Sequence, residues 1–128
     1  MLLSSVVPYA KFLGLSMELL EDGTCMGRLR YADHLIGDSS IPALHGGTLA
    51  ALLESTAIFT ALFATEGSAI ARTITLTIDY LRSGRAQDST CTAKIVRAGR
   101  RILVVQVSAF QDDPDKPIST ATVHLLVA

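Results

Sequence analysis

Cysteine and charge are scarce in this chain, and each scarcity excludes a class of protein. Its 128 residues contain two cysteines, Cys25 and Cys91, which are too few for a disulfide framework and lack the spacing of a metal site. We therefore expect two reduced structural thiols in a cytoplasmic protein that binds no metal. Only 18% of the residues are charged, and the net charge of -1 argues against nucleic acid as a partner.

The sequence also lacks the pattern of a targeting or membrane segment. Residues 1–7 have a short apolar run without a preceding basic region, unlike a secretory signal peptide. Residues 46–65 are almost long enough to span a bilayer, but Glu54 lies near their middle, and a charge there is costly in lipid. We therefore predict a core helix at 46–65 and no membrane partner.

Apolar side chains, by contrast, make up 49% of the chain. A chain of this length buries a core of its own, so we expect one domain across residues 1–128. An apolar excess in a small domain usually means that surface is hidden by association with another copy. We therefore expect a homo-oligomer.

The period of the apolar pattern predicts the main secondary structure. Residues 46–65 are apolar on nearly every side, which indicates a helix that is covered in most directions. Residues 72–82 alternate instead, as a strand does. The strand's apolar face is formed by Ile74, Leu76, Ile78 and Tyr80, and its polar face by Thr73, Thr75, Thr77 and Asp79.

Further strands are predicted around this helix. A short helix at 8–15 is followed by a hairpin at 16–31 with its turn at Asp22-Gly23, a loop at 32–44, and later strands at 89–97, 101–111 and 118–127. Short connections favour antiparallel neighbours. We therefore predict an α+β fold in which one curved antiparallel sheet wraps around one long central helix.

The start of the predicted helix holds His45, Gly46 and Gly47, and Glu54 follows nine residues after the histidine. The first N–H groups of a helix have no partner within it, and glycine lets a ligand approach them closely. A carbonyl oxygen bound there is polarised, and an oxyanion is stabilised. Glu54 lies in an apolar stretch, where burial disfavours its charged form. We predict that it acts as a general base toward water or as a nucleophile toward that carbonyl.

The spacing of Gly46 and Glu54 limits how they can cooperate. They are eight positions apart, which corresponds to about 12 Å along a helix, whereas a general base must lie within about 3 Å of its target or one water away. One helix therefore cannot easily supply both groups. Two antiparallel copies can, so we predict a site shared across a two-fold dimer interface.

These motifs resemble those of the PaaI-like hotdog-fold acyl-CoA thioesterases. The resemblance rests on His45-Gly46-Gly47 with its acid nine residues on, on Tyr80-Leu81-Arg82, and on Leu13-Gly14-Leu15 and Gly99-Arg100-Arg101. It implies a hotdog fold and hydrolysis of an acyl-CoA thioester without metal or organic cofactor, in a homodimer or a tetramer of two dimers. The acyl group would be small or medium, aromatic groups included.

The resemblance also implies roles for individual residues. Glu54 matches the family's catalytic carboxylate, and Gly46 matches the residue whose N–H polarises the thioester carbonyl. His45 matches the neighbour that helps to shape the pocket, and we expect Gly47 beside the substrate. Thr73 matches a Ser or Thr that positions the water or the carboxylate.

Two positions depart from the family's pattern. Ser39 stands where the family usually has Asn or Gln, and we expect it in the site as a shorter side chain that holds a water. Pro42 replaces a glycine. These departures leave a second function open, a non-catalytic acyl-CoA-binding or sensing module on the same fold. A hydratase or dehydratase fits less well, because those enzymes resemble a different arrangement, with a histidine paired to a distant acid.

Basic residues are concentrated between 72 and 101, where seven of the eleven lie against two acids. Arginine suits phosphate because its planar fork bonds two oxygens. We predict that the arginines at strand ends and turns converge at the mouth of the site and bind the phosphates of CoA. These are Arg82, Arg85, Arg100 and Arg101.

Overall fold

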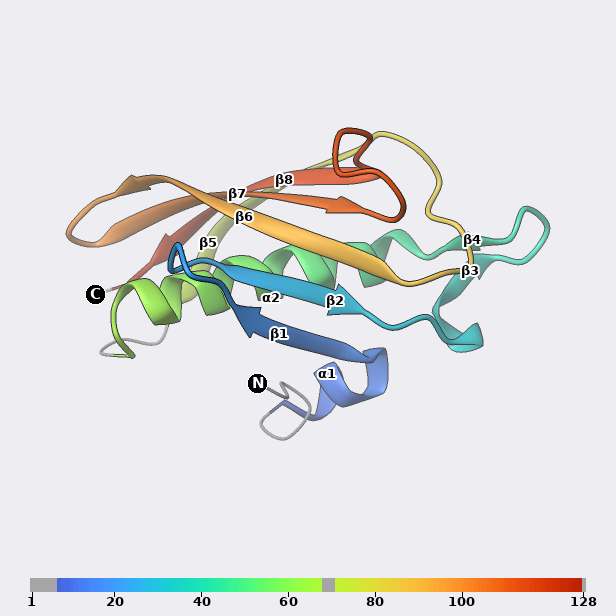
Figure 1. Cartoon of the computed structure of the whole chain (residues 1–128), viewed down its shortest axis with the longest axis horizontal. Coiled ribbons are helices and arrows are strands. Elements are labelled where there is room, and N and C mark those ends of the chain that lie inside the picture. Colours follow the sequence, from blue (N-terminus) through green and yellow to red (C-terminus); the bar gives the residue numbers. More distant parts are fainter. Residues whose placement is uncertain (1–6, 68–70, 128) are drawn as a thin grey trace.

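The computed structural model describes residues 7–67 and 71–127 (Figure 1). This part of the chain contains the helices α1 (Pro8–Leu13) and α2 (Gly46–Ala64) and a short 3-10 helix, η2 (Asp33–Leu35). Its strands are β1 (Leu15–Leu19), β2 (Cys25–Leu29), β3 (Ile36–Asp38), β4 (Ala43–Leu44), β5 (Arg72–Tyr80), β6 (Ser89–Ala98), β7 (Ile102–Phe110) and β8 (Ser119–Leu126).

Six of these strands form one antiparallel sheet in the order β1-β2-β6-β7-β8-β5, and α2 runs along one face of that sheet (Figure 1). The predicted fold class is therefore confirmed. Strand β5 pairs with β8 rather than with β6, which follows it in sequence. The connection from β5 to β6, residues 81–88, therefore crosses the end of the sheet.

One side of α2 packs against the sheet, and we call it the sheet-facing flank. Its buried residues recur as adjacent pairs every four positions: Thr48, Leu49, Leu52, Leu53, Thr56, Ala57, Thr60 and Ala61. That spacing marks one face of a helix with 3.6 residues per turn. By length and composition α2 also satisfies the test for a membrane-crossing helix, as core helices do. Here its sheet-facing flank lies in the core.

The segment before α2 contains more regular structure than the sequence predicts. A loop is predicted at 32–44, whereas η2, β3 and β4 occur there, with β3 and β4 forming a small hairpin. Strands this short carry too few residues for an alternating pattern to be visible in sequence. The hairpin anchors the start of α2, because the His45 N–H donates to the Leu35 carbonyl oxygen and the Leu44 N–H to the Gly84 carbonyl oxygen, each at 2.9 Å.

The alternation predicted for β5 is wrong at its beginning. Thr73 lies opposite Leu125 and Thr75 lies opposite His124, so the register shifts between them, as in a β-bulge. Residues that lie directly opposite share a face, so Thr73 joins the buried Leu125 on the helix side of the sheet. Ile74 is 54% exposed instead. The bulge thus places Thr73 on the helix side of the sheet and Ile74 on the exposed side, the reverse of the prediction.

Both cysteines are free and fully buried. Desolvation by burial raises the pKa of the Cys25 thiol to about 11 and that of Cys91 to about 12. The two thiols therefore stay protonated at neutral pH and are poor nucleophiles, as expected of structural cysteines.

Candidate functional site

The start of α2 is capped by the side chain of the residue that precedes it. His45 Nδ1 accepts a hydrogen bond from the Gly47 N–H at 2.9 Å. Because a backbone N–H can only donate, Nδ1 carries no proton. The His45 carbonyl oxygen accepts from the Thr48 N–H at 3.0 Å and from its hydroxyl at 2.7 Å. His45 therefore shapes the helix start as its N-cap, and its Nδ1 lone pair is already in use.

This cap leaves one free donor at the helix start. The Gly47 and Thr48 N–H groups are bonded to His45, whereas no residue in the described ranges accepts from the Gly46 N–H. The N–H groups at a helix start carry partial positive charge and point away from the helix. Gly46 thus offers a single oriented donor for a carbonyl oxygen or an oxyanion.

Tyr80, at the end of β5, holds Gly46 in place. The Tyr80 hydroxyl donates to the Gly46 carbonyl oxygen at 2.8 Å. A Cβ on Gly46 would lie 3.2 Å from the Tyr80 ring, so glycine is the residue that fits here without displacing the ring. The alternating pattern predicts Tyr80 on the apolar face of its strand but does not predict this contact. A tyrosine at the end of an apolar face, where its hydroxyl can reach a neighbouring element, is the signal that could have found it.

A groove of about 390 Å³ opens beside Gly46. It lies between the start of α2, the end of β5 and the first residues of the following connection. The residues that line it are Ala43, Leu44, Gly46, Leu49, Tyr80, Leu81, Arg82, Ser83 and Gly84. Its walls are therefore mostly apolar around one oriented N–H, which is the usual character of a small-molecule site.

Glu54 lies on the side of α2 that faces away from the sheet. We call this side the open flank; its residues are all half-exposed and comprise Ala50, Ala51, Glu54, Ser55, Ile58, Phe59, Leu62 and Phe63. The prediction that Glu54 is buried does not hold within one chain. Among the described residues nothing forms a hydrogen bond or ion pair with its carboxylate. One chain therefore does not bring Glu54 to the Gly46 N–H.

The other two predicted site residues lie apart from Gly46 as well. The Thr73 hydroxyl is buried on the helix side of the sheet and has no hydrogen-bond partner within residues 7–67 and 71–127. It stands near the end of β5 opposite to Tyr80, which contacts Gly46. Ser39 is exposed in the turn between β3 and β4 and forms no hydrogen bond with His45 or Gly46.

The four predicted phosphate-binding arginines are not brought together within one chain. The antiparallel register places the 99–101 turn at the end of the sheet where β5 begins, because Ile102 and Arg72 both lie opposite Leu126. Arg82 and Arg85 follow the end of β5, at the opposite end of the sheet. Arg82 Nε donates to the Pro117 carbonyl oxygen at 3.0 Å, and Arg85 forms an ion pair with Asp112.

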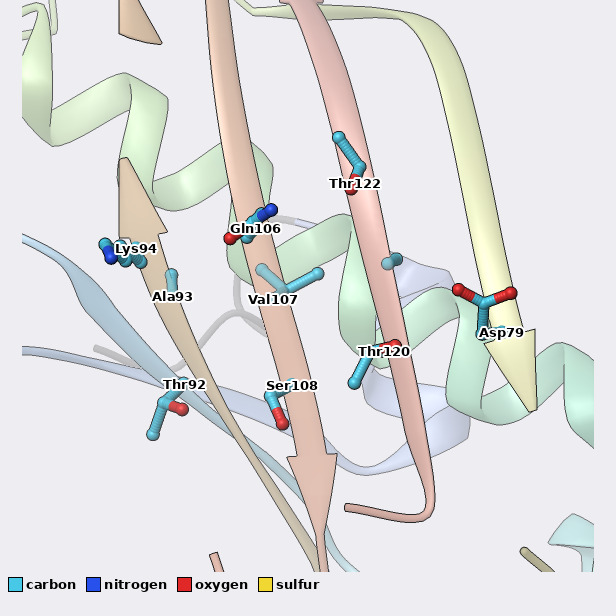
Figure 2. A pocket seen from close by; sticks show the side chains of 10 residues that line it. Asp79, Thr92, Ala93, Lys94, Gln106, Val107, Ser108, Thr120 and Thr122 are labelled. Carbon is cyan, nitrogen blue, oxygen red and sulfur yellow. The ribbon is translucent and has the colours of Figure 1, made fainter. Parts of the chain in front are cut away.

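A larger hollow, of about 450 Å³, lies on the other face of the sheet (Figure 2). It is lined by outward-facing polar residues of β5 to β8, namely Asp79, Thr92, Lys94, Gln106, Ser108, Thr120 and Thr122. Gly46 does not line it, and α2 passes behind the strands in this view. The hollow therefore has no part in the site at the helix start.

This chain is similar to known proteins over nearly its whole length, as three of them show. The medium/long-chain acyl-CoA thioesterase YigI of Salmonella typhimurium is 28% identical over 94% of this chain and 86% of its own length. The conserved protein PA5202 of Pseudomonas aeruginosa is 27% identical, with a TM-score of 0.86 over 96% of this chain and 95% of its own. A phenylacetic acid degradation-related protein of Ralstonia eutropha is 25% identical, with a TM-score of 0.80 over 95% and 91%.

A family model extends this comparison to the site itself. The model of the thioesterase superfamily matches residues 42–118, which is more than half of the chain. The matched segment contains the start of α2, Glu54, Thr73 and the end of β5. The similarity therefore includes the groove and the free Gly46 N–H.

Proposed function

Because this chain belongs to the thioesterase superfamily, we propose that it hydrolyses acyl-CoA thioesters to a free acid and CoA. Its membership confirms the resemblance to PaaI-like hotdog thioesterases and the predicted class of enzyme, a thioester hydrolase. The name of the Salmonella relative concerns medium and long acyl chains, and the sequence predicts small or medium ones. We propose medium-chain acyl-CoA, which both ranges include.

The observation that carries this proposal is the Gly46 N–H, which has no acceptor among the described residues and belongs to a residue that lines the groove. A thioester oxygen that accepts from this donor is polarised, and the hydrogen bond strengthens as the oxygen becomes an oxyanion. His45 and Tyr80 hold the donor from its two sides. The donor therefore stabilises charge that develops only when the carbonyl is attacked.

The attacking group is proposed to come from a second chain. Strand β5 is a sheet edge, and its Ile74 and Tyr80 are 54% and 55% exposed. A long exposed edge strand pairs readily with another chain. Antiparallel pairing of β5 with its own copy about a two-fold axis would set the two α2 helices antiparallel on one face of a continuous sheet. Glu54 of one chain would then lie toward Gly46 of the other, in a homodimer with two equivalent sites.

Two routes of hydrolysis use these groups. In the first, Glu54 of the second chain takes a proton from a water, the water oxygen bonds to the thioester carbon, and the carbon–sulfur bond breaks to release CoA thiolate. In the second, the Glu54 carboxylate attacks that carbon directly, the carbon–sulfur bond breaks to release CoA thiolate, and water then hydrolyses the resulting anhydride. In both routes the Gly46 N–H stabilises the oxyanion. The Thr73 hydroxyl of the second chain, which antiparallel pairing of β5 would bring toward this site, is buried without a hydrogen-bond partner among the described residues. It is proposed to orient the water or the carboxylate.

The test is release of free thiol from short, medium, long and aromatic acyl-CoA thioesters. We expect the highest kcat/KM for a medium chain and a loss of about 10²–10⁴-fold in Glu54→Gln, since general acid–base groups contribute rate factors of this order. Glu18→Gln, at an exposed position of β1, serves as the matched control. Absence of thiol release from every thioester, or full activity in Glu54→Gln, would contradict the proposal.

A non-catalytic acyl-CoA-binding module remains the second candidate. It is favoured by Ser39, which is exposed in its turn and does not contact the helix start, so the water that it is predicted to hold has no visible place in one chain. Titration calorimetry separates the two candidates. Saturable binding of acyl-CoA by wild-type protein without thiol release would favour the binding module.

A further inference from the structure

The hairpin formed by β6 and β7 carries positive charge of which none is neutralised locally. Residues 89–111 contain four cations and no aspartate or glutamate. All four are exposed, and we call them the hairpin cations: Lys94, Arg97, Arg100 and Arg101. None of their side chains forms an ion pair or a hydrogen bond with a described residue. The hairpin therefore has unpaired charge to offer to a partner.

A β-bulge in β6 sets the direction of Arg97. This residue lies opposite Val104, because Val96 is inserted as an extra residue in the strand. In an unbroken register Arg97 would lie opposite Leu103, which is buried on the helix side of the sheet. The bulge thus turns Arg97 to the outer face, where Lys94 also lies. Val96 is itself 52% exposed, so β6 presents an aliphatic side chain next to a cation in the chain.

The hairpin also projects from the rest of the sheet. Strand β2 pairs with residues 89–91 of β6, so residues 94–98 extend past that pairing. The turn that follows is held in place, because the Gly99 N–H donates to the Ile102 carbonyl oxygen at 2.8 Å. The Val127 N–H donates to the Arg101 carbonyl oxygen, also at 2.8 Å. This turn forms the left end of the molecule in Figure 1.

A protruding element of this kind does not enclose a small ligand. Arg97, Arg100 and Arg101 line neither the groove at Gly46 nor the hollow on the outer face. A small anion bound to them would keep most of its surface in water, whereas a small-molecule site usually buries its ligand. Exposed cations beside an exposed aliphatic side chain suit an extended surface of anionic lipid instead.

We propose that the hairpin cations dock this protein on an anionic lipid surface. Acyl chains partition into lipid, so such a surface also concentrates the proposed substrate. This reason for lipid rests on the proposed function, whereas the charge and shape of the hairpin do not. Docking through a hairpin needs no spanning segment. The proposal therefore departs from the predicted absence of a membrane partner, which rested on residues 1–7 and 46–65.

In the proposed dimer, docking would bring a groove close to the lipid. The 99–101 turn lies at the end of the sheet where β5 begins, and the groove lies where β5 ends. Antiparallel pairing of two β5 strands sets the beginning of one beside the end of the other. The hairpin of one chain and the groove of the second chain would therefore lie at the same end of the continuous sheet.

The test is flotation of the full chain with phosphatidylcholine vesicles that contain either phosphatidylserine or no anionic lipid. We expect binding to the anionic vesicles alone. Arg97→Gln should lower the partition coefficient about fivefold, the equivalent of about 1 kcal/mol for one cation, and Val96→Ser should lower it less. Arg30→Gln is the matched control, because Arg30 is exposed and follows β2 at the other end of the sheet.

Two further probes identify the source of the negative charge. Excess free CoA should not displace the protein from anionic vesicles, and displacement would show that the hairpin cations bind nucleotide phosphate. Binding to polyglutamate but to no vesicle would point to an acidic protein. Either result would overturn the docking, as would equal binding to both kinds of vesicle or equal losses in Arg97→Gln and Arg30→Gln. Flotation does not depend on turnover. If the wild-type protein floats with anionic vesicles alone and hydrolyses no thioester, the docking stands and the proposed hydrolysis fails.

Discussion

The two flanks of α2 belong to one helix and have similar apolar content, yet they differ in how far the rest of the chain packs against them and forms hydrogen bonds with them. On the sheet-facing flank Leu52 and Leu53 are fully buried, and the hydroxyl of Thr56 donates to the Leu52 carbonyl oxygen at 2.7 Å. Thr60 on the same flank accepts from the Cys25 N–H at 3.0 Å. This flank is packed and hydrogen-bonded within the chain.

The open flank is only partly covered within one chain. Ile58, Phe59 and Phe63 are half-exposed around Glu54, whose carboxylate has no partner among the described residues. A contiguous apolar surface with a charge at its centre is typical of an interface or a ligand site rather than of a free surface. The sheet-facing flank therefore stabilises the fold of one chain. We propose that the open flank binds the second chain and takes part in catalysis.

The largest effect is expected when two inactive variants are mixed, an experiment that tests whether the open flank contacts a second chain. Gly46→Pro and Glu54→Gln chains should each be nearly inactive as homodimers, because each lacks one group of both sites. Equal mixing after unfolding and refolding should restore about a quarter of wild-type activity, since about half of the dimers are mixed and each mixed dimer has one intact site. Thiol release measures this recovery. Activity that stays at the mean of the two parents would exclude a shared site.

The next prediction isolates the donor at the helix start. His45 has an extended backbone (φ -63°, ψ 131°), which suits a residue before proline, and the first helical position tolerates proline. Gly46→Pro removes the N–H, whereas Gly46→Ala keeps it and introduces similar crowding against Tyr80. We expect kcat/KM to fall about 10²–10³-fold in Gly46→Pro and far less in Gly46→Ala. Equal losses would mean that the crowding matters and the N–H does not.

A stability measurement compares the two flanks directly. Leu53→Ala on the sheet-facing flank should reduce the free energy of unfolding by about 2–5 kcal/mol, as for other buried leucines. For Ile58→Ala on the open flank the loss should grow with protein concentration, because the second chain of the proposed dimer covers the part of that side chain that is exposed in one chain. Urea unfolding at two protein concentrations measures both effects. If the loss of unfolding free energy in Ile58→Ala did not depend on protein concentration, this would contradict the proposal that a second chain covers the open flank.

The smallest effect is expected at Tyr80. Tyr80→Phe removes the hydrogen bond to the Gly46 carbonyl oxygen and keeps the ring that packs against Gly46. One neutral hydrogen bond contributes about 0.5–1.5 kcal/mol to stability, so the urea midpoint should fall slightly. We expect kcat/KM to fall a few-fold as well, because the Gly46 donor is held less firmly. Tyr9→Phe, at an exposed position of α1, is the control. A shifted midpoint with unchanged kcat/KM would show a structural role only.

Features encoded by neighbouring residues were predictable. The helix predicted at 46–65 occurs at Gly46–Ala64, and the hairpin predicted around Asp22-Gly23 occurs as β1 and β2. The resemblance implies that His45 helps to shape the pocket, and the structure shows His45 as the N-cap of α2. Periodicity, turn residues and capping act over a few residues, so they are visible in the sequence.

Features that depend on pairing between distant segments were not predictable. The face of Thr73 depends on a register shift against β8, some fifty residues later. The contact between Tyr80 and Gly46 depends on β5 being the strand that ends beside α2. The arginines of the 99–101 turn lie far from Arg82 because of the order of strands in the sheet. None of these relations has a local signature.

By itself, the sequence determined the α+β class, the long apolar helix that begins after His45, and the lone acid near its middle. The tertiary structure decided which N–H is left free, which tyrosine holds it, which flank of α2 remains open, and which cations adjoin the groove. The physical reason is the range of the interactions. Helix capping and apolar periodicity are set by residues close in the chain, whereas strand order, register and loop contacts are chosen by burial and hydrogen bonding among residues far apart in sequence.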